Sequence, residues 1–73
     1  AEYEELIRRL YEAISSLPPM QARRVHARYM LGMKVKDIAA MEGITPSQAG
    51  KSIHAALRRL RRYFVRQKWT VNL

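Results

Sequence analysis

Apolar residues recur along this chain at intervals of three and four positions, the spacing that places side chains on one face of an α-helix. The pattern predicts four helices, over residues 2–16, 19–31, 35–42 and 46–66. No segment shows the strict alternation of apolar and polar residues that is typical of a half-buried strand. The sequence therefore predicts an all-α fold in one domain, residues 1–73, with a three-helix core preceded by an N-terminal helix.

Prolines and glycines mark the breaks between these helices. Pro18 and Pro19 end the first helix, because proline lacks an amide donor and clashes with the preceding turn, and Pro19 suits the first position of the next. Gly32 and Gly43 each follow an apolar stripe, where a left-handed glycine commonly ends a helix. Thr45 is a favourable N-cap for the last helix.

The apolar stripes also predict a core. Each helix contributes the residues that share its most apolar face, with Tyr3 at the start of the first stripe. The expected core residues are Leu6, Leu10, Ala13, Ile14, Leu17, Ala22, Val25, Tyr29, Met30, Val35, Ile38, Ala39, Met41, Ala49, Ile53, Ala56, Leu57, Leu60 and Phe64.

The third and fourth predicted helices together have the features of a helix-turn-helix. Ala39 is small enough for a close helix crossing, and Gly43 allows a sharp turn four positions later. Pro46 begins the second helix of the motif, and Gln48 lies three residues after Thr45, as a capping box requires. In DNA-binding members of this motif, the first turns of the second helix enter the major groove.

The distribution of charge points to a polyanionic partner. The 73 residues carry a formal net charge of +8. Residues 1–16 hold four glutamates and two arginines, a net of −2, whereas residues 17–73 hold twelve Lys or Arg and two acidic residues, a net of +10. A basic body favours double-stranded DNA as the partner, ahead of an anionic membrane surface. A surface that only keeps the protein in solution is the remaining interpretation.

Other functional classes lack support in the sequence. The absence of cysteine excludes disulfides and cysteine-bearing zinc sites, and agrees with a cytoplasmic location. His26 and His54 are 28 positions apart, so no metal site is expected. No apolar run approaches the roughly 20 residues that span a bilayer. Without a glycine-rich phosphate loop or a nucleophile–base pair, we expect no enzyme, no cofactor and no small-molecule ligand.

Polar positions near the start of the last helix are candidates for reading bases. Gln can bond adenine bidentately, Lys can donate to guanine, Ser can bond several bases, and Pro can touch a thymine methyl group. The candidate base-reading residues are Pro46, Ser47, Gln48, Lys51 and Ser52. Contacts to phosphates set register without carrying sequence information. The candidate phosphate-binding residues are Arg23, Arg24, Arg28, Lys34, Lys36, His54, Arg58 and Arg62.

Several short segments, in this order and spacing, resemble region 4 of the sigma-70 family of RNA polymerase sigma factors. They are Leu17-Pro18-Pro19, Arg28, Gly32-Met33, Asp37-Ile38-Ala39, Glu42-Gly43-Ile44-Thr45 and Ser52-Ile53-His54-Ala55-Ala56-Leu57-Arg58-Arg59-Leu60. The resemblance covers about residues 6–64. Residues 41–45 look like those of stand-alone, phage-associated sigma-like proteins of bacteria. Response-regulator output domains share the helix-turn-helix but usually lack the first helix and its Leu-Pro-Pro break.

The resemblance implies a function and partners. It implies binding to a −35 promoter element in the major groove and docking on the flap of the RNA polymerase β subunit. It places the base-reading positions at Pro46, Ser47 and Lys51. Housekeeping members carry Arg and Glu at the first two, so a housekeeping −35 sequence is not expected here. Lys34 replaces the Ser or Thr that caps the third helix in the family.

A second hypothesis is a protein-interaction module that docks on RNA polymerase or an anti-sigma factor and has little DNA binding of its own. The weak base-reading potential of Pro46 and Ser47 motivates it. The sequence leaves open the promoter recognised, the presence of a region 2 in the native chain, and the oligomeric state. It is compatible both with a sigma factor and with a stand-alone regulator.

Overall fold

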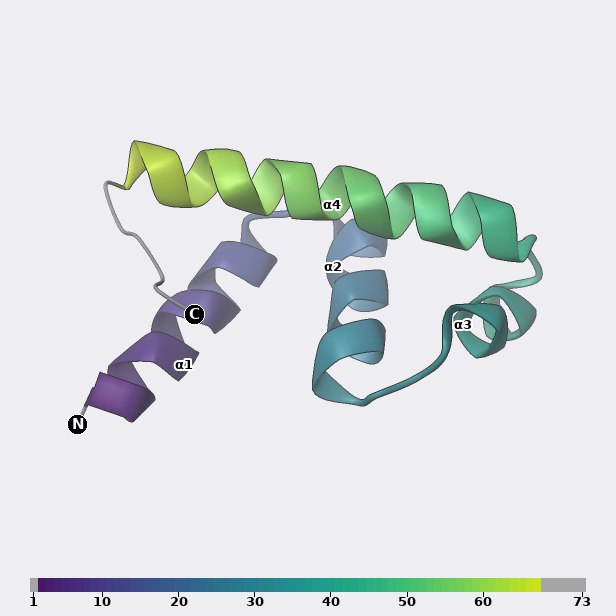
Figure 1. Ribbon diagram of the computed structural model, residues 1–73, viewed down its shortest axis with the longest axis horizontal. Helices are drawn as coiled ribbons and strands as arrows, with labels where there is room; N and C mark the ends of the chain where they lie inside the picture. Colours follow the sequence, from purple (N-terminus) through teal and green to yellow (C-terminus); the bar gives the residue numbers. More distant parts are fainter. Residues whose placement is uncertain (1, 68–73) are drawn as a thin grey trace.

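The computed structural model describes residues 2–67, and every regular element in that range is helical (Figure 1). In chain order the elements are α1 (Glu2–Ser15), α2 (Pro19–Val25), the π-helical turn η1 (His26–Met30), α3 (Val35–Glu42) and α4 (Pro46–Arg66). The predicted all-α, helix-turn-helix architecture is confirmed, and α3 and α4 have the predicted bounds.

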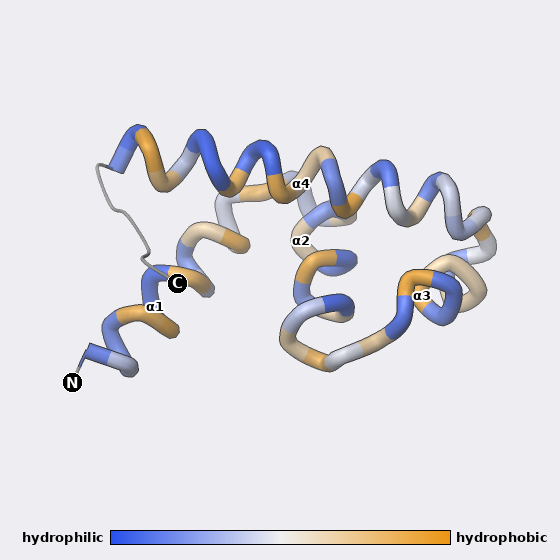
Figure 2. The backbone as a smooth tube through the Cα atoms, in the orientation of Figure 1, coloured by the Kyte–Doolittle hydropathy of each residue, from blue (hydrophilic) through white to orange (hydrophobic). Residues whose placement is uncertain are grey.

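The 21-residue helix α4 spans the molecule, and the other helices lie along one side of it (Figure 1). Helix α3 lies against its N-terminal half, α2 against its middle and α1 against its C-terminal half (Figure 1). Figure 2 shows most hydrophobic positions of α4 on the side that faces the other helices. Because α4 touches all three other α-helices, one of its faces organises the core while the opposite face is left uncovered.

Two clusters of apolar side chains form the core. The first joins α1, α2 and the second half of α4, and it contains Ala13, Ile14, Leu17, Val25, Ala56 and Leu60. The second joins η1, α3 and the first half of α4, and it contains Ala27, Ile38 and Ile53. Ile38 is completely buried and fixes α3 against α4. Met33 and Val35, which are partly buried, pack against this second cluster and extend the contact between α3 and its neighbours.

The helix ends follow the predicted signals. Helix α2 begins at Pro19, directly after the Pro18 break. Gly43 has φ 69°, and the amide of Ile44 donates to the carbonyl of Ala39 at 3.0 Å, which closes α3 with a Schellman motif. Lys34 precedes α3 in an extended conformation without a side-chain cap hydrogen bond, as expected from the replacement of Ser or Thr.

The helix predicted over residues 19–31 is helical from Pro19 to Met30, but its second half is not α-helical. The chain is α-helical to Val25 and then widens into the π turn η1, where the amide of Leu31 donates to the carbonyl of His26 at 3.1 Å. The amide of Met33 reaches back to the carbonyl of Ala27 at 3.0 Å, and Gly32 has φ 70°. These hydrogen bonds join residues five and six positions apart, whereas an α-helix joins residues four positions apart. The periodicity of apolar residues does not reveal this difference.

Four of the expected core residues lie at the surface. Tyr3, Tyr29 and Met41 are 72%, 55% and 66% exposed, and Leu57 is at the edge of the core with 38% exposed. Ala27, which the predicted stripe omitted, is buried against the second cluster. The reason is that η1 packs against α3 as well as α4. The buried side of a short helix is set by its neighbours, and one-helix periodicity does not contain that information.

Candidate nucleic-acid interface

The N-terminal end of α4 is rigidly formed by its cap. Thr45 is extended, and its Oγ1 accepts a hydrogen bond from the amide of Gln48 at 3.1 Å. The amide of Thr45 in turn donates to Oε1 of Gln48 at 2.9 Å, so the predicted capping box is confirmed. The side-chain carbonyl of Gln48 is therefore occupied, and its amide group keeps two donors for a ligand.

The first two turns of α4 have one buried and one open face. Ala49 and Ile53 are 0% and 4% exposed and anchor the helix to the core. Pro46, Ser47 and Lys51, three of the predicted base-reading residues, are exposed. The position of these exposed residues is thus fixed by the anchors on the opposite side of the same helix.

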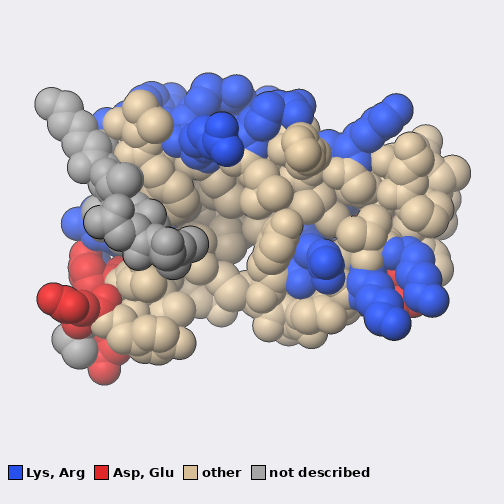
Figure 3. Space-filling model, viewed as in Figure 1, with Lys and Arg blue, Asp and Glu red and all other residues tan. Residues whose placement is uncertain are grey.

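The open face continues along the whole of α4. Ser47, Lys51, His54, Arg58 and Arg62 follow one another at intervals of three and four residues, and all five are exposed. Such spacing places them in one row along the helix. Figure 3 shows Lys and Arg side chains gathered over α4, whereas most of the visible acidic side chains gather over the start of α1. The structure therefore places two of the predicted base-reading residues and all three of the predicted phosphate-binding residues of α4 in one row.

Ser52 lies apart from this row. It is half-buried, and its Oγ accepts a hydrogen bond of 2.7 Å from Nη1 of Arg24 on α2. The side chain faces the interior of the helix-turn-helix rather than the open face of α4. Its predicted role in base reading has no support from this geometry.

The predicted phosphate-binding residues outside α4 fall into two groups. Arg23, Lys34 and Lys36 are exposed. Arg24 is only 15% exposed, and its guanidinium bonds to Glu42 and Ser52. The assignment of Arg24 to phosphate binding therefore conflicts with its position.

Arg28 is also engaged within the protein. Its Nη1 donates to the carbonyl of Met33 at 3.0 Å, and its guanidinium carbon lies 5.9 Å from the centre of the Tyr29 ring. These contacts hold the guanidinium against the loop between η1 and α3. Arg28 therefore stabilises the entry to α3, and only its remaining donors are open to a ligand.

The electrostatics of the helix-turn-helix are dominated by positive charge. Hydrogen bonds from Arg24 hold the pKa of Glu42 below its ordinary value; burial opposes this, and the charges of Arg24 and Arg23 add to it. Glu42 is thus ionised at neutral pH, but its charge is neutralised at close range by Arg24. The electrostatic potential around the motif is therefore positive and comes from its exposed Lys and Arg side chains.

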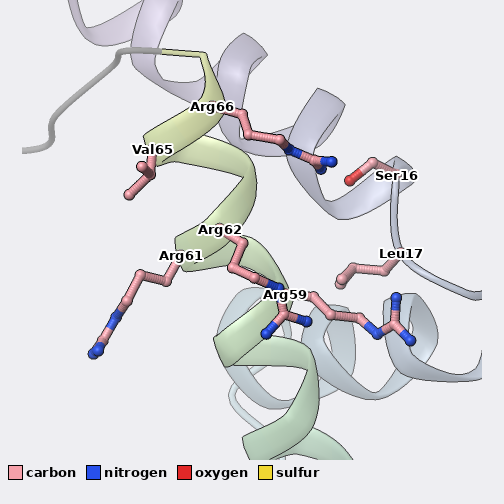
Figure 4. A pocket seen from close by; sticks show the side chains of 7 residues that line it. All are labelled: Ser16, Leu17, Arg59, Arg61, Arg62, Val65 and Arg66. Atoms are coloured by element: carbon pink, nitrogen blue, oxygen red, sulfur yellow. The ribbon is translucent and has the colours of Figure 1, made fainter.

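Sequence reasoning did not single out a second basic surface near the end of α4. Figure 4 shows a hollow between α4 and the α1–α2 connection, lined by Ser16, Leu17, Arg59, Arg61, Arg62, Val65 and Arg66. Arg66 extends toward Ser16, Arg59 passes beside Leu17 and Arg62 lies between them along α4, whereas Arg61 points away (Figure 4). Arg59, Arg62 and Arg66 have i, i+3, i+7 spacing, which could have indicated that they share one helix face. The spacing could not have indicated that apolar side chains from another part of the chain lie beside that face.

Two alternative kinds of site find no support in the part of the chain that the structure describes. Among residues 2–67, no three His, Asp or Glu side chains come together as metal ligands would. Within the same range, no helix has both the length and the apolar character needed to cross a membrane.

Comparison with known proteins gives one match. Residues 7–60 match the family model described as Sigma-70, region 4. The matched range begins in α1 and ends in α4, so it includes α3, the turn and α4 as far as Leu60. No curated protein and no solved structure matches the chain.

Proposed function

The chain belongs to the sigma-70 region 4 family, and from this premise we propose that it binds double-stranded DNA in a sequence-specific manner. The proposed target is a −35-like promoter element, recognised during transcription initiation or its regulation. The N-terminal part of α4 enters the major groove, which is about 12 Å wide and admits an α-helix.

The observation that carries the proposal is the exposed, anchored start of α4. Ser47 and Lys51 are exposed on a helix whose opposite side is fixed by Ala49 and Ile53 and whose first turn is fixed by the capping box of Thr45. Groups that read bases must be held in place before binding, because ordering them on the DNA would reduce the affinity.

The proposed contacts are of two kinds. In the proposal, base edges are read by Pro46, Ser47, Gln48 and Lys51, which are all exposed, and Gln48 contributes its amide donors. Phosphates are held by two arginines and a histidine on the open face of α4 and by exposed cations on or near α2 and α3. This second set consists of Arg23, Lys34, Lys36, His54, Arg58 and Arg62. Ser52 and Arg24 are omitted because they bond to each other.

Selection of bound sites from random duplexes tests the proposal directly. We expect one preferred sequence to be enriched, and it then serves as the probe in a titration at several salt concentrations. Five phosphate-binding cations predict a slope of roughly −4.5 in log affinity against log salt. A flat salt response, or a pool that stays random after selection, would contradict DNA recognition.

The arginine hollow favours a second function alongside DNA binding, namely docking on a protein such as the RNA polymerase β flap or an anti-sigma factor. Arg62 lies 15 residues beyond Ser47, about 22 Å along the helix axis. A partner at the hollow would therefore leave the start of α4 open to DNA, although it would share Arg62 with the proposed phosphate contacts. The mixture of arginines with Leu17 and Val65 suits an acidic protein segment that also carries apolar side chains.

A pull-down separates the two functions. Arg59→Ala with Arg66→Ala should reduce the retention of RNA polymerase by the immobilised protein and leave the preferred duplex bound. Lys51→Ala is the matched control, and it should have the opposite effect. Equal retention of polymerase by the wild-type, Arg59→Ala/Arg66→Ala and Lys51→Ala proteins would argue against docking at the hollow.

A further inference from the structure

A three-way hydrogen-bonded contact joins the helices of the DNA-binding motif, and it lies outside both proposed contact sets. Arg24, on α2, donates from Nε to both carboxylate oxygens of Glu42 at 3.0 and 3.1 Å and from Nη2 to Oε1 at 2.9 Å. Its Nη1 donates to Oγ of Ser52 at 2.7 Å. The side chains of Arg24 and Glu42 are only 15% and 10% exposed. We refer to Arg24, Glu42 and Ser52 as the clamp.

The clamp spans the turn of the helix-turn-helix. Glu42 is the last residue of α3, directly before the left-handed Gly43, and Ser52 lies in the second turn of α4. One guanidinium on α2 therefore holds one point on each side of the turn. Its planar shape fixes the direction of every bond, so the clamp constrains the angle between α3 and α4 as well as their separation.

The chemistry of the clamp indicates a role in specificity rather than in net stability. A buried ion pair gains little over an apolar pair of similar size, because both charges lose their hydration. Apolar side chains such as Ile38 and Ile53 already hold α3 against α4, but the hydrophobic effect that drives their packing is non-directional. The hydrogen bonds of the Arg24 guanidinium are directional, and a base-reading helix must be held in a precise orientation by its supports.

We propose that Arg24 is a positioning residue for DNA recognition: through Glu42 and Ser52 it sets the orientation of α4 relative to α3, and this orientation determines the preference for one DNA sequence over random duplex. The part of this inference that concerns sequence preference rests on the proposed DNA binding. The part that concerns the orientation of α4 can be tested on the protein without DNA.

The decisive variant is Arg24→Met combined with Glu42→Leu. It removes one positive and one negative charge, so the net charge stays at +8 and the affinity for random duplex should not change. It also leaves no buried charge without a partner, so the fold should persist. We expect the ratio of affinities for preferred and random duplex to fall about tenfold, the equivalent of one well-aligned base contact.

Two further proteins make the result specific. Arg8→Met with Glu12→Leu removes the exposed Arg8–Glu12 pair of 3.8 Å and the Arg8–Glu5 bond from α1, again without a change in net charge, and should keep the wild-type ratio. Arg24→Lys keeps the charge of Arg24, but an ammonium group lacks the planar fork, so the ratio should fall as in the double variant. An Arg24→Lys protein with the wild-type ratio would show that charge alone suffices, and would overturn the proposal.

The orientation of α4 is measured separately, on the free protein, from residual dipolar couplings of backbone amides in α3 and α4. We expect the interhelical angle to change in the Arg24→Met/Glu42→Leu protein and to stay constant in the α1 control. If the angle and the affinity ratio both remain at wild-type values, the clamp has no positioning role. If the wild-type chain prefers no duplex, the proposed DNA recognition fails, and the dipolar couplings still decide whether the clamp orients α4.

Discussion

Lys51→Ala and Arg58→Ala should weaken DNA binding in two different ways. Both side chains are exposed on the same face of α4, seven residues apart, which is about 10 Å along the axis. Lys51 lies within the first two turns, where the helix is proposed to meet base edges, whereas Arg58 lies beyond them. The pair therefore compares base reading with phosphate binding on one helix face.

The expected magnitudes follow from these positions. Loss of a base contact by Lys51→Ala costs about 1–3 kcal/mol at the preferred site, a loss of roughly 5- to 150-fold, and much less on random duplex. Loss of a phosphate contact by Arg58→Ala weakens both duplexes alike and reduces the salt slope by about 0.9. Because both side chains are exposed, neither substitution should change the free energy of unfolding by more than about 0.5 kcal/mol.

Fluorescence anisotropy measures both effects, with labelled preferred and random duplexes titrated at several salt concentrations. The quantity to compare is the ratio of the two affinities for each protein. Lys51→Ala should lower this ratio, and Arg58→Ala should leave it unchanged. If the two substitutions alter the ratio equally, or if neither changes the affinity for the preferred duplex, the assignment of bases to Lys51 and phosphates to Arg58 is wrong.

Three further predictions concern stability. Ile38→Ala should lower the free energy of unfolding by about 2–5 kcal/mol in urea titrations, because the side chain is fully buried, whereas Met41→Ala on the exposed side of α3 should change it by less than about 0.5 kcal/mol. Thr45→Ala should cost about 1 kcal/mol through loss of the α4 cap, and an unchanged thermal midpoint would contradict this. Because the Arg24 bond lowers the pKa of Glu42, it stabilises the folded state fully at pH values above the carboxyl's ordinary pKa of 4.5, and this stabilisation is lost as the pH falls toward the folded-state pKa. Glu42→Gln should remove this part of the pH dependence when the free energy of unfolding is measured against pH. An identical pH profile in the variant would exclude the Arg24–Glu42 bond as the source.

Local signals in the sequence were sufficient to predict where most helices begin and end. Pro19, Gly43 and Thr45 act through their own backbone or through neighbours a few residues away, and such effects can be read from the sequence alone. The row of exposed residues on α4 could also be predicted, because it follows from the helical repeat of one long element.

Contacts between distant residues could not be predicted in the same way. Arg24 looked like any other cation of α2, and its burial depends on Glu42, 18 positions away, and on Ser52, 28 positions away. The burial of Ala27 depends likewise on Ile38 of α3 and Ile53 of α4, which pack in the same cluster. One sequence gives the composition of each helix face but not the partner that the face meets.

The continuity of α4 has a mechanical consequence. A single uninterrupted helix carries the proposed DNA-facing residues at one end and the arginine hollow at the other. If both proposals hold, a protein docked at the hollow has a fixed distance along α4 and a fixed rotation about it relative to the DNA. Each residue inserted between Lys51 and Arg59 would change that rotation by about 100° and that distance by about 1.5 Å. The length of α4 would then set how the two partners are oriented relative to each other.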